Sequence, residues 1–342
     1  MKRVILSYLF LALSTLRAQH GDWTWLHSKM FKADERAHLE HKKRVMYEKI
    51  DLPPFNQLVF SWNASRPKQG HFAFWAQVRD IKTGKWSKWV CMMKWGADVQ
   101  QSFNSSADTL RSYHHVRFEM GKRHANGFRI KITSHNGASL KQLSSFSASL
   151  SDLSKLLSEE ADYSLPTIHI KGLPLISQFE LNHPKNDSLC SPTSCAMLMS
   201  YLLNKPVHPL DFAEKAYDRG LGAYGSWPFN IAHAFEISGG AVRCSVARLH
   251  TFKELYARLF RGLPVIVSVR GPLQGSATPY ASGHLLVVVG WDNKTKEVIC
   301  HDPAFQPSES VVKRYPIKDF LVAWERSKRL AYLFEYAMED HG

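Results

Sequence analysis

The chain has 342 residues, more than one ordinary hydrophobic core supports, so we expect two domains. A hydrophobic share of 44% with 12% aromatic residues excludes a disordered chain. The formal charge of +14 lies entirely in residues 1–150, which hold 24 Lys/Arg against 10 Asp/Glu, whereas residues 151–342 hold 20 of each.

The first 18 residues have the pattern of an export signal. Residues 1–3 carry positive charge, residues 4–13 are apolar, and residues 14–18 lead to a cleavage point after Ala18. Arg17 is atypical so close to a cleavage point, which leaves an uncleaved hydrophobic N-terminus as the alternative. The apolar run is shorter than the roughly 20 residues that a membrane-spanning helix needs. We therefore predict a signal peptide at 1–18 and an exported protein that is secreted, periplasmic or associated with the cell envelope. Residues 19–50 are rich in Lys, Glu and His and are predicted to form a charged lead-in segment.

Residues 51–152 are predicted to form a basic β-sandwich domain. Short runs of alternating hydrophobicity, separated by turn residues, are typical of such strands. These runs cover residues 57–62, 71–79, 86–94, 115–119 and 127–132. The excess positive charge favours an anionic cell-envelope surface as a partner.

Tryptophans alternate with lysines in residues 86–95, which raises the question of nucleic-acid binding. An amphipathic strand with Trp packed inward and Lys facing outward is the favoured interpretation. An export signal also argues against a nucleic-acid partner, so none is expected.

After a polar connector at 151–164, residues 165–342 are predicted to form a second domain, in which helices come first and strands follow. This order favours an α+β domain with an antiparallel sheet. Helices are predicted at 192–203, 209–217, 228–237 and 251–261, and strands at 265–269, 284–290, 297–301 and 331–336.

Cys190 lies directly before the predicted helix that starts at Pro192, a residue favoured in a first helical turn. The unpaired N–H groups and the positive end of the helix dipole lower the pKa of a thiol there. A cysteine at a helix start is more often structural, and a nucleophile also needs a base. Cys195, inside the helix, is expected to be a core residue.

A candidate base and its orienting carboxylate occur further along the chain. Two apolar runs flank residues 292–296, which have the composition of a hairpin turn. A loop of odd length places His284 and Asp302 on one face, either directly opposite each other or as diagonal neighbours. Each has a structural explanation alone, His284 as a strand-edge residue and Asp302 as a turn former. Together with Cys190 they favour catalysis, with Gly283 leaving room for substrate.

At these residues the chain resembles the C39-like branch of the papain-like cysteine peptidases, over about residues 173–336. The resemblance rests on the segments at 177–178, 189–194, 225–230, 262–268, 283–288 and 301–303. It implies a papain-like fold with Cys190 as the nucleophile, His284 as general base and acid, and Asp302 as the residue that orients the imidazole. Gln178 would donate to the oxyanion beside the backbone N–H of Cys190. It lies twelve residues before Cys190, further than is usual in papain-like enzymes.

The resemblance also implies a peptide or protein substrate and hydrolysis through a thioester, with no metal or cofactor. The segment at 225–230, with Trp227 and Asn230, either lines the substrate cleft or is a packed turn before the next helix. The same triad could transfer the acyl group to an amine, and the second domain could instead be a non-catalytic scaffold beside a binding domain. Five cysteines without zinc spacing leave at least one free thiol and indicate no metal site. The oligomeric state is not indicated.

Overall fold

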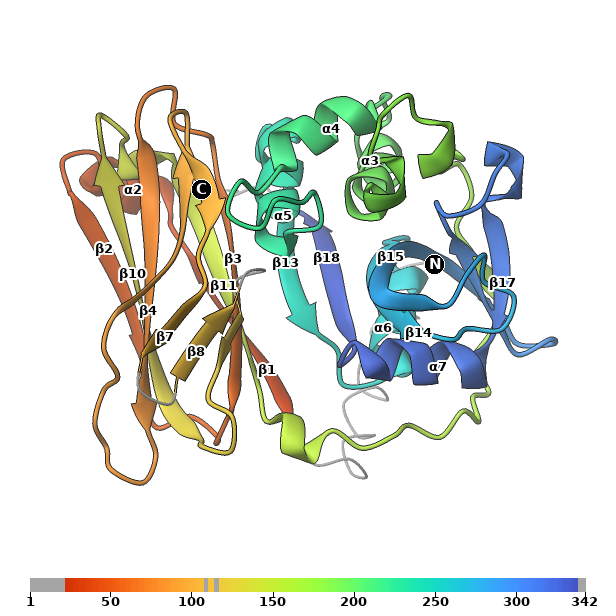
Figure 1. Cartoon of the computed structure of the whole chain (residues 1–342), viewed down its shortest axis with the longest axis horizontal. Helices are drawn as coiled ribbons and strands as arrows, with labels where there is room; N and C mark the ends of the chain where they lie inside the picture. The colour runs from red at the N-terminus through yellow and green to blue at the C-terminus, as the bar shows by residue number, and fades with distance from the viewer. Residues whose placement is uncertain (1–21, 108–109, 114–116, 338–342) are drawn as a thin grey trace, which may run out of the picture.

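The computed structural model describes residues 22–107, 110–113 and 117–337. The chain forms a sheet-rich N-terminal part and a mixed α/β part beside it (Figure 1). The signal peptide predicted at 1–18 lies outside the described residues. Within the described ranges, no helix is both long enough and apolar enough to cross a membrane.

Two antiparallel sheets make up the N-terminal part. Sheet A has the strand order β1-β11-β3-β9-β8-β7, and sheet B has the order β2-β10-β4-β5-β6. The elements are β1 Thr24–Met30, α2 Ala33–Leu39, β2 Arg44–Lys49, β3 Gln57–Ala64, β4 His71–Asp80, β5 Val90–Gly96, β6 Gln100–Ser102, β7 Ser105–Ala107, β8 Leu110–Tyr113, β9 Arg117–Glu119, β10 Ala125–His135 and β11 Leu143–Ser151.

Successive side chains of a strand point to opposite faces, and the apolar side chains on the inner faces of sheets A and B pack against one another. Every second residue of β3 and β4 enters one buried cluster shared by both sheets, including Phe60, Trp62 and Phe74. The rings of Trp62 and Phe74 lie 4.4 Å apart between their centroids and join the sheets at the centre of this cluster. The remaining residues of each strand face away from the cluster.

The prediction of a separate lead-in segment over residues 19–50 was wrong from residue 24 onward. Strand β1 pairs with β11 in sheet A, and β2 pairs with β10 in sheet B. The charges of β2 point outward, while Val45 and Tyr47 pack against the shared cluster. High charge density therefore concealed two ordinary edge strands.

The strand predicted at 86–94 is shifted, and its tryptophans do not share one direction. Strand β5 begins at Val90, and Trp95 is fully buried between the sheets. Trp86 and Trp89 are partly exposed, and cationic side chains from the outer face of β10 lie over both rings. The expectation that every Trp packs inward was thus wrong for these two residues.

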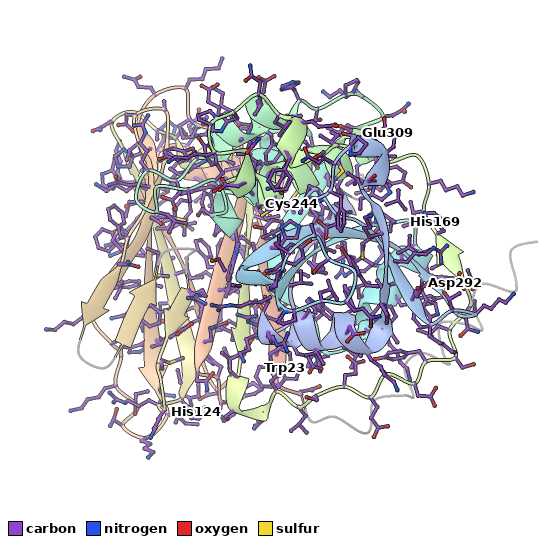
Figure 2. All side chains as sticks on the ribbon, turned by 45° about the vertical axis from the view of Figure 1, so that its right-hand side comes forward. Trp23, His124, His169, Cys244, Asp292 and Glu309 are labelled. Carbon is purple, nitrogen blue, oxygen red and sulfur yellow. The ribbon has the colours of Figure 1, made fainter. Side chains whose placement is uncertain are left out.

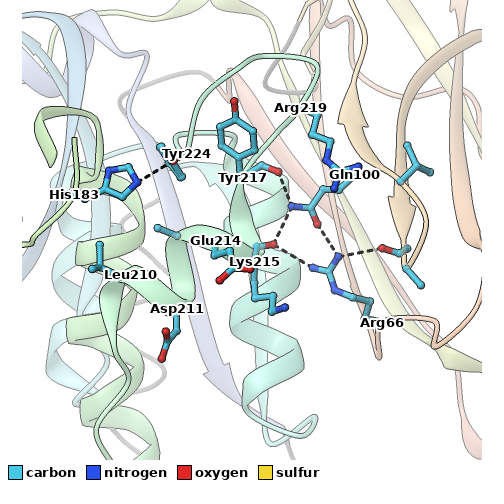
Figure 3. A pocket seen from close by; sticks show the side chains of 14 residues that line it. Arg66, Gln100, His183, Leu210, Asp211, Glu214, Lys215, Tyr217, Arg219 and Tyr224 are labelled. Carbon is cyan, nitrogen blue, oxygen red and sulfur yellow. Dashed lines mark hydrogen bonds between the residues drawn. The ribbon is translucent and has the colours of Figure 1, made fainter. Parts of the chain in front are cut away.

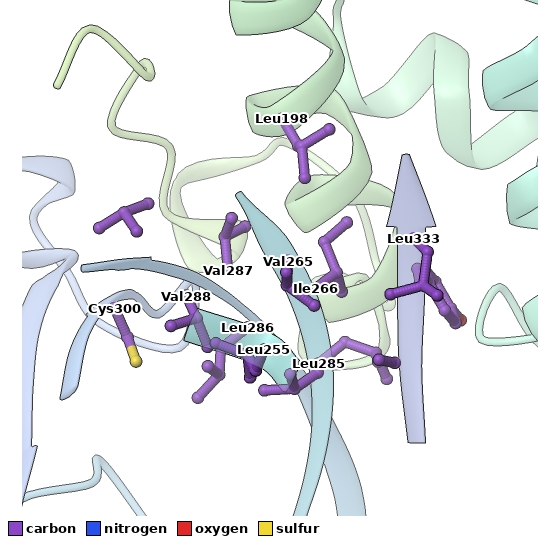
Figure 4. Close-up of a cluster of buried hydrophobic side chains, with 14 of the residues drawn as sticks. Leu198, Leu255, Val265, Ile266, Leu285, Leu286, Val287, Val288, Cys300 and Leu333 are labelled. Carbon is purple, nitrogen blue, oxygen red and sulfur yellow. The ribbon is translucent and has the colours of Figure 1, made fainter. Parts of the chain in front are cut away.

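The second part is built on a seven-stranded antiparallel sheet, sheet C, with the order β13-β18-β14-β15-β16-β17 and β12 added beside β15. Its core is formed by aliphatic side chains of α3, β14 and β15 (Figure 4). The elements are β12 Ile168–His169, α3 Cys190–Leu203, α4 Pro209–Ala216, α5 Trp227–Ile237, β13 Val242–Arg248, α6 Phe252–Phe260, β14 Val265–Gly271, β15 Tyr280–Asp292, β16 Glu297–His301, β17 Val312–Pro316, α7 Ile317–Arg326 and β18 Leu330–Tyr336.

Polar side chains of sheet A join the two parts by binding the edge strand β13, which carries Cys244 (labelled in Figure 2). The amide of Asn63 donates to the carbonyl of Cys244 at 2.6 Å and accepts from its N–H at 2.8 Å. Two residues along, the N–H of Val246 donates to the hydroxyl of Ser61 at 3.1 Å. These bonds satisfy backbone groups that an edge strand otherwise leaves unpaired.

Candidate active site

Helix α3 begins at Cys190 and carries the thiol in its first turn. The backbone N–H groups of Ser191 and Leu285 hydrogen-bond to the sulfur. The N–H of Cys190 itself has no acceptor within the described ranges, as expected at a helix start. Ten of the fourteen residues of α3 are buried, because the helix packs between α4, α5 and sheet C.

The β15–β16 hairpin brings His284 next to Asp302, but by another route than predicted. Its loop has four residues rather than an odd number, since Asp292 pairs with Glu297. A bulge between Val288 and Gly290 then shifts the register, so that Val287 pairs with His301. This is the diagonal arrangement, one of the two predicted. The Nε2 of His284 lies 2.7 Å from Oδ1 of Asp302.

The three side chains form one hydrogen-bonded chain. Since Nε2 of His284 bonds to Asp302, the other ring nitrogen serves the bond to Cys190. Burial would lower the pKa of His284, but the charge and hydrogen bond of Asp302, aided by Cys190, raise it to about 10. Burial likewise opposes ionisation of Cys190, yet the bond to His284 and its charge bring the net thiol pKa below its ordinary value. The arrangement therefore favours a thiolate beside an imidazolium.

Two tyrosines complete the surroundings of Asp302, and sequence reasoning missed both. The hydroxyls of Tyr280 and Tyr315 donate to Oδ2 of Asp302 at 2.7 and 2.6 Å. The ring of Tyr280 also stacks on His284, with centroids 4.1 Å apart and an interplanar angle of 20°. Alternation within the 280–284 segment could have pointed to Tyr280, whereas Tyr315 comes from β17 and depends on the sheet order.

Gln178 lies in a short 3-10 turn, Gln178–Glu180, whose first N–H donates to the carbonyl of Pro303. Its buried side-chain amide donates to the carbonyls of Asn186 and Asp187, both at 2.9 Å. Gln178 thus holds the loop that leads into Cys190, and both of its amide hydrogens are engaged there. Its role as an oxyanion donor stays a prediction.

The family comparison agrees with this geometry. Residues 170–332 match the sequence model of the Peptidase_C39 like family. The second domain is C39-like. The resemblance that the motifs predicted is thereby confirmed.

Two solved structures are similar to the C39-like domain. One, from Bacillus anthracis, is described as a C39-like peptidase; it is 18% identical, with a TM-score of 0.40, and covers 51% of this chain and 100% of its own. The other is xylellain, a cysteine protease from Xylella fastidiosa, at 12% identity and a TM-score of 0.34, covering 53% of this chain and 91% of its own. No curated protein matches the chain.

The residues predicted to contact substrate take different positions in the C39-like domain. Asn230 is fully buried and donates to the carbonyls of Tyr224 and Ser226, so it supports the turn before α5 instead of facing a substrate. Trp227 lies under the guanidinium of Arg117, 5.7 Å from its ring centroid; its predicted substrate contact stays a prediction.

The backbone conformation before His284 favours a glycine at residue 283. The φ of Gly283 is +94°, and a Cβ there would lie 3.9 Å from its nearest protein neighbour, the carbonyl of Val269. Its role in leaving room for substrate stays a prediction.

A hollow of about 730 Å³ lies between the C39-like domain and the two N-terminal sheets (Figure 3). Arg66 lines the hollow from the N-terminal sheets, whereas His183, Tyr217 and Tyr224 line it from the C39-like domain. The hydroxyl of Tyr224 lies 3.2 Å from Nε2 of His183, in the segment before Cys190. The triad side chains do not line this hollow.

Over the described ranges, no group of three His, Cys, Asp or Glu residues could hold a metal ion. All five cysteines are free thiols. Cys195, Cys244 and Cys300 are buried, and burial raises the pKa of each. Cys91 is partly exposed like Cys190, but burial raises its pKa as well. Cys190 alone combines partial exposure with a lowered thiol pKa among these cysteines.

Proposed function

We propose that the chain is a cysteine peptidase that hydrolyses peptide bonds through Cys190, His284 and Asp302. The observation that carries this proposal is the continuous hydrogen-bonded chain from the sulfur through the imidazole to the carboxylate. A nucleophile, its base and an orienting group within bonding reach are what acyl transfer needs.

In this reaction the Cys190 thiolate attacks the carbonyl carbon of the peptide bond. The free N–H of Cys190 stabilises the oxyanion of the tetrahedral intermediate. His284 donates its proton to the leaving amine, which produces a thioester on Cys190. His284 then takes a proton from water, and the water hydrolyses the thioester.

The same proposal places the enzyme outside the cytoplasm, with a β-sandwich domain in front of a papain-like domain. The charged and apolar pattern of residues 1–18 supports export, and the positive charge of residues 1–150 supports attachment to an anionic envelope surface. The position of peptidase activity after cell fractionation tests the export step directly.

Mapping of iodoacetamide modification by mass spectrometry, on the full chain below neutral pH, tests the nucleophile. Cys190 is expected to react first, because its thiolate is stabilised. Cys91 provides the matched control, since it is also partly exposed but has a raised pKa. If Cys91 reacts as fast as Cys190, exposure alone governs labelling and the nucleophile is misassigned.

Activity is measured on a fluorescence-quenched peptide library, with Cys190→Ala and Cys91→Ala as the paired variants. Loss of cleavage in the first variant only supports the proposal. Mass analysis of the products, with an added amine, separates hydrolysis from acyl transfer because the second reaction leaves the amine in the product. If Cys190 reacts fast but the protein neither cleaves a peptide nor transfers an acyl group, both the peptidase and the acyltransferase assignments are contradicted.

A further inference from the structure

Sheet B presents an outer face that no other described element covers. The outer face of sheet A is covered by β13 and α5, whereas the outer face of sheet B points away from the C39-like domain, which contacts sheet B at its edge strand β6 (Figure 1). Strand pairing places outward residues of four strands in neighbouring rows. One row holds Met46, Lys131, Trp75 and Cys91, and the next holds Glu48, Arg129 and Gln77.

Aromatic rings and cations alternate on this surface, which we call the tryptophan face and define by Trp75, Trp86, Trp89, Lys94, Arg129 and Lys131. The Nζ of Lys131 lies 4.2 Å from the ring centroid of Trp89 and 5.1 Å from that of Trp75. The guanidinium of Arg129 lies 3.9 Å from the ring centroid of Trp86. Such contacts hold the rings in fixed positions at a partly exposed surface.

The positive charge of the tryptophan face is only partly neutralised. Arg129 forms an ion pair with Glu48. Lys94 and Lys131 have no carboxylate within salt-bridge distance in the part of the chain that the structure describes. The two lysines therefore leave positive charge beside the indole rings, which attracts an anionic ligand.

The tryptophan face is hollowed. A hollow of about 440 Å³ is lined by Trp75, Trp89, Lys94 and His135, with the small side chain of Ala73 between them. The lining of this hollow therefore sets indole rings beside a cationic side chain, a combination that suits an anionic ligand with apolar faces.

We propose that the tryptophan face binds an acidic polysaccharide. Sugar rings present flat C–H faces that stack on Trp75 and Trp89, and their carboxylates would reach Lys94 and Lys131. This binding site is separate from Cys190 and does not depend on peptidase activity; it would hold the enzyme at a polysaccharide-bearing surface.

Affinity electrophoresis of the full chain tests the proposal, with polygalacturonate, a polymer of a uronic acid, as the probe. We expect retardation that weakens with added salt, and none in gels that contain neutral dextran. Trp89→Ala should weaken binding by at least about fivefold, since one stacking contact is lost. Lys131→Gln should also weaken it, while Lys318→Gln, the matched loss of an exposed lysine on α7, should leave it unchanged.

Melting curves establish that each variant is folded, and Lys131→Gln keeps the test decisive if Trp89→Ala does not fold. The proposal is overturned if the folded variants bind polygalacturonate as the unaltered chain does. It is also overturned if single-stranded oligothymidylate binds more tightly and loses its binding in the same variants, because the tryptophan face would then be a nucleic-acid surface.

Discussion

His284 depends on Asp302 for its charge. Burial alone lowers an imidazole pKa, and the carboxylate of Asp302, 2.7 Å away, makes the larger contribution to raising it to about 10, with a smaller one from Cys190. The carboxylate is itself held by three donors, two tyrosine hydroxyls and the N–H of Ala304. The chemistry at the sulfur is therefore controlled by groups that never touch it.

Removing the charge of Asp302 should change the pH dependence of the rate. In the unaltered enzyme, kcat/KM should rise with pH as Cys190 ionises and fall only as His284 loses its proton near pH 10. Asp302→Asn keeps the hydrogen bond but not the charge, so the alkaline limb should move down by several units while part of the activity remains. Asp292→Asn removes a partly buried carboxylate that is paired with Arg314; it is the control and should leave the profile unchanged.

A double-mutant cycle on kcat measures whether His284 and Asp302 act as one unit. His284→Ala should lower kcat by about 10²-fold or more. Adding Asp302→Ala to that variant should cost almost nothing further, because Asp302 acts through the imidazole. Losses that multiply independently would contradict this coupling.

Substitutions of the two tyrosines around Asp302 should separate the effect of their hydrogen bonds from the effect of ring stacking on His284. Tyr280→Phe and Tyr315→Phe each remove one buried bond to a carboxylate, a contribution of about 1.5–3 kcal/mol to the free energy of unfolding. Tyr280→Leu also removes the ring that lies on His284, so kcat/KM should fall further than in Tyr280→Phe. Equal rates for the Phe and Leu variants, at equal melting temperature, would show that the stack does not position the imidazole.

At the scale of elements, strand β3 is joined to strand β13 by hydrogen bonds from its side chains, whereas neighbouring strands of one sheet are joined by backbone hydrogen bonds. Asn63→Ala leaves the N–H and carbonyl of Cys244 buried without their partner. We expect a loss of about 2–4 kcal/mol in the free energy of unfolding, measured by urea denaturation. Asn293→Ala, in the β15–β16 turn, is the matched control and should change it by less than about 0.5 kcal/mol. A small effect at both positions would mean that water replaces the lost amide.

Strand β11 was missed by sequence reasoning for a physical reason. Strand β11 alternates serines with Phe146, Ala148 and Leu150, and its composition resembles a linker. Ser149 accepts from the N–H of Arg248, so the polar side of β11 faces the C39-like domain and not solvent. Hydrophobic periodicity cannot distinguish a polar interface between domains from a solvated surface.

The candidate site was predictable where its residues lie close in the sequence or in one hairpin. Cys190 follows from its place before Pro192, and His284 with Asp302 follows from the β15–β16 hairpin. The bulge at Val289 could not be foreseen, although it sets the register. Gln178 and Tyr315 depend on loops and sheet order that only the folded chain reveals.

At the scale of the whole molecule, the two hydrophobic cores interlock. Val59 of sheet A belongs to the buried cluster of the C39-like domain, while Phe229 and Ala232 of α5 belong to the cluster between the N-terminal sheets. Neither core is complete without residues from the other part. The two parts are thus expected to unfold together.

Urea unfolding followed by two probes tests this expectation. Seven of the ten tryptophans precede residue 152, so fluorescence reports mainly on the N-terminal sheets, whereas alkylation of buried Cys195 reports on the C39-like domain. Both probes should give one transition with the same midpoint. Two midpoints would show that the interlocked side chains do not couple the parts.

The side-chain bonds from sheet A to the edge strand β13 also determine what happens if the chain is cut between its two parts. Residues 153–166 link the two parts, and Glu159 in this stretch is fixed by Arg329 and the N–H of Phe252. A protease that severed the connector would break one peptide bond and leave the Asn63 and Ser61 bonds untouched. The nicked chain would run as two fragments on a denaturing gel and as one particle on a sizing column. A cut in this segment would therefore alter the covalent structure without releasing a free C39-like domain, and a preparation with two bands would still hold both parts together.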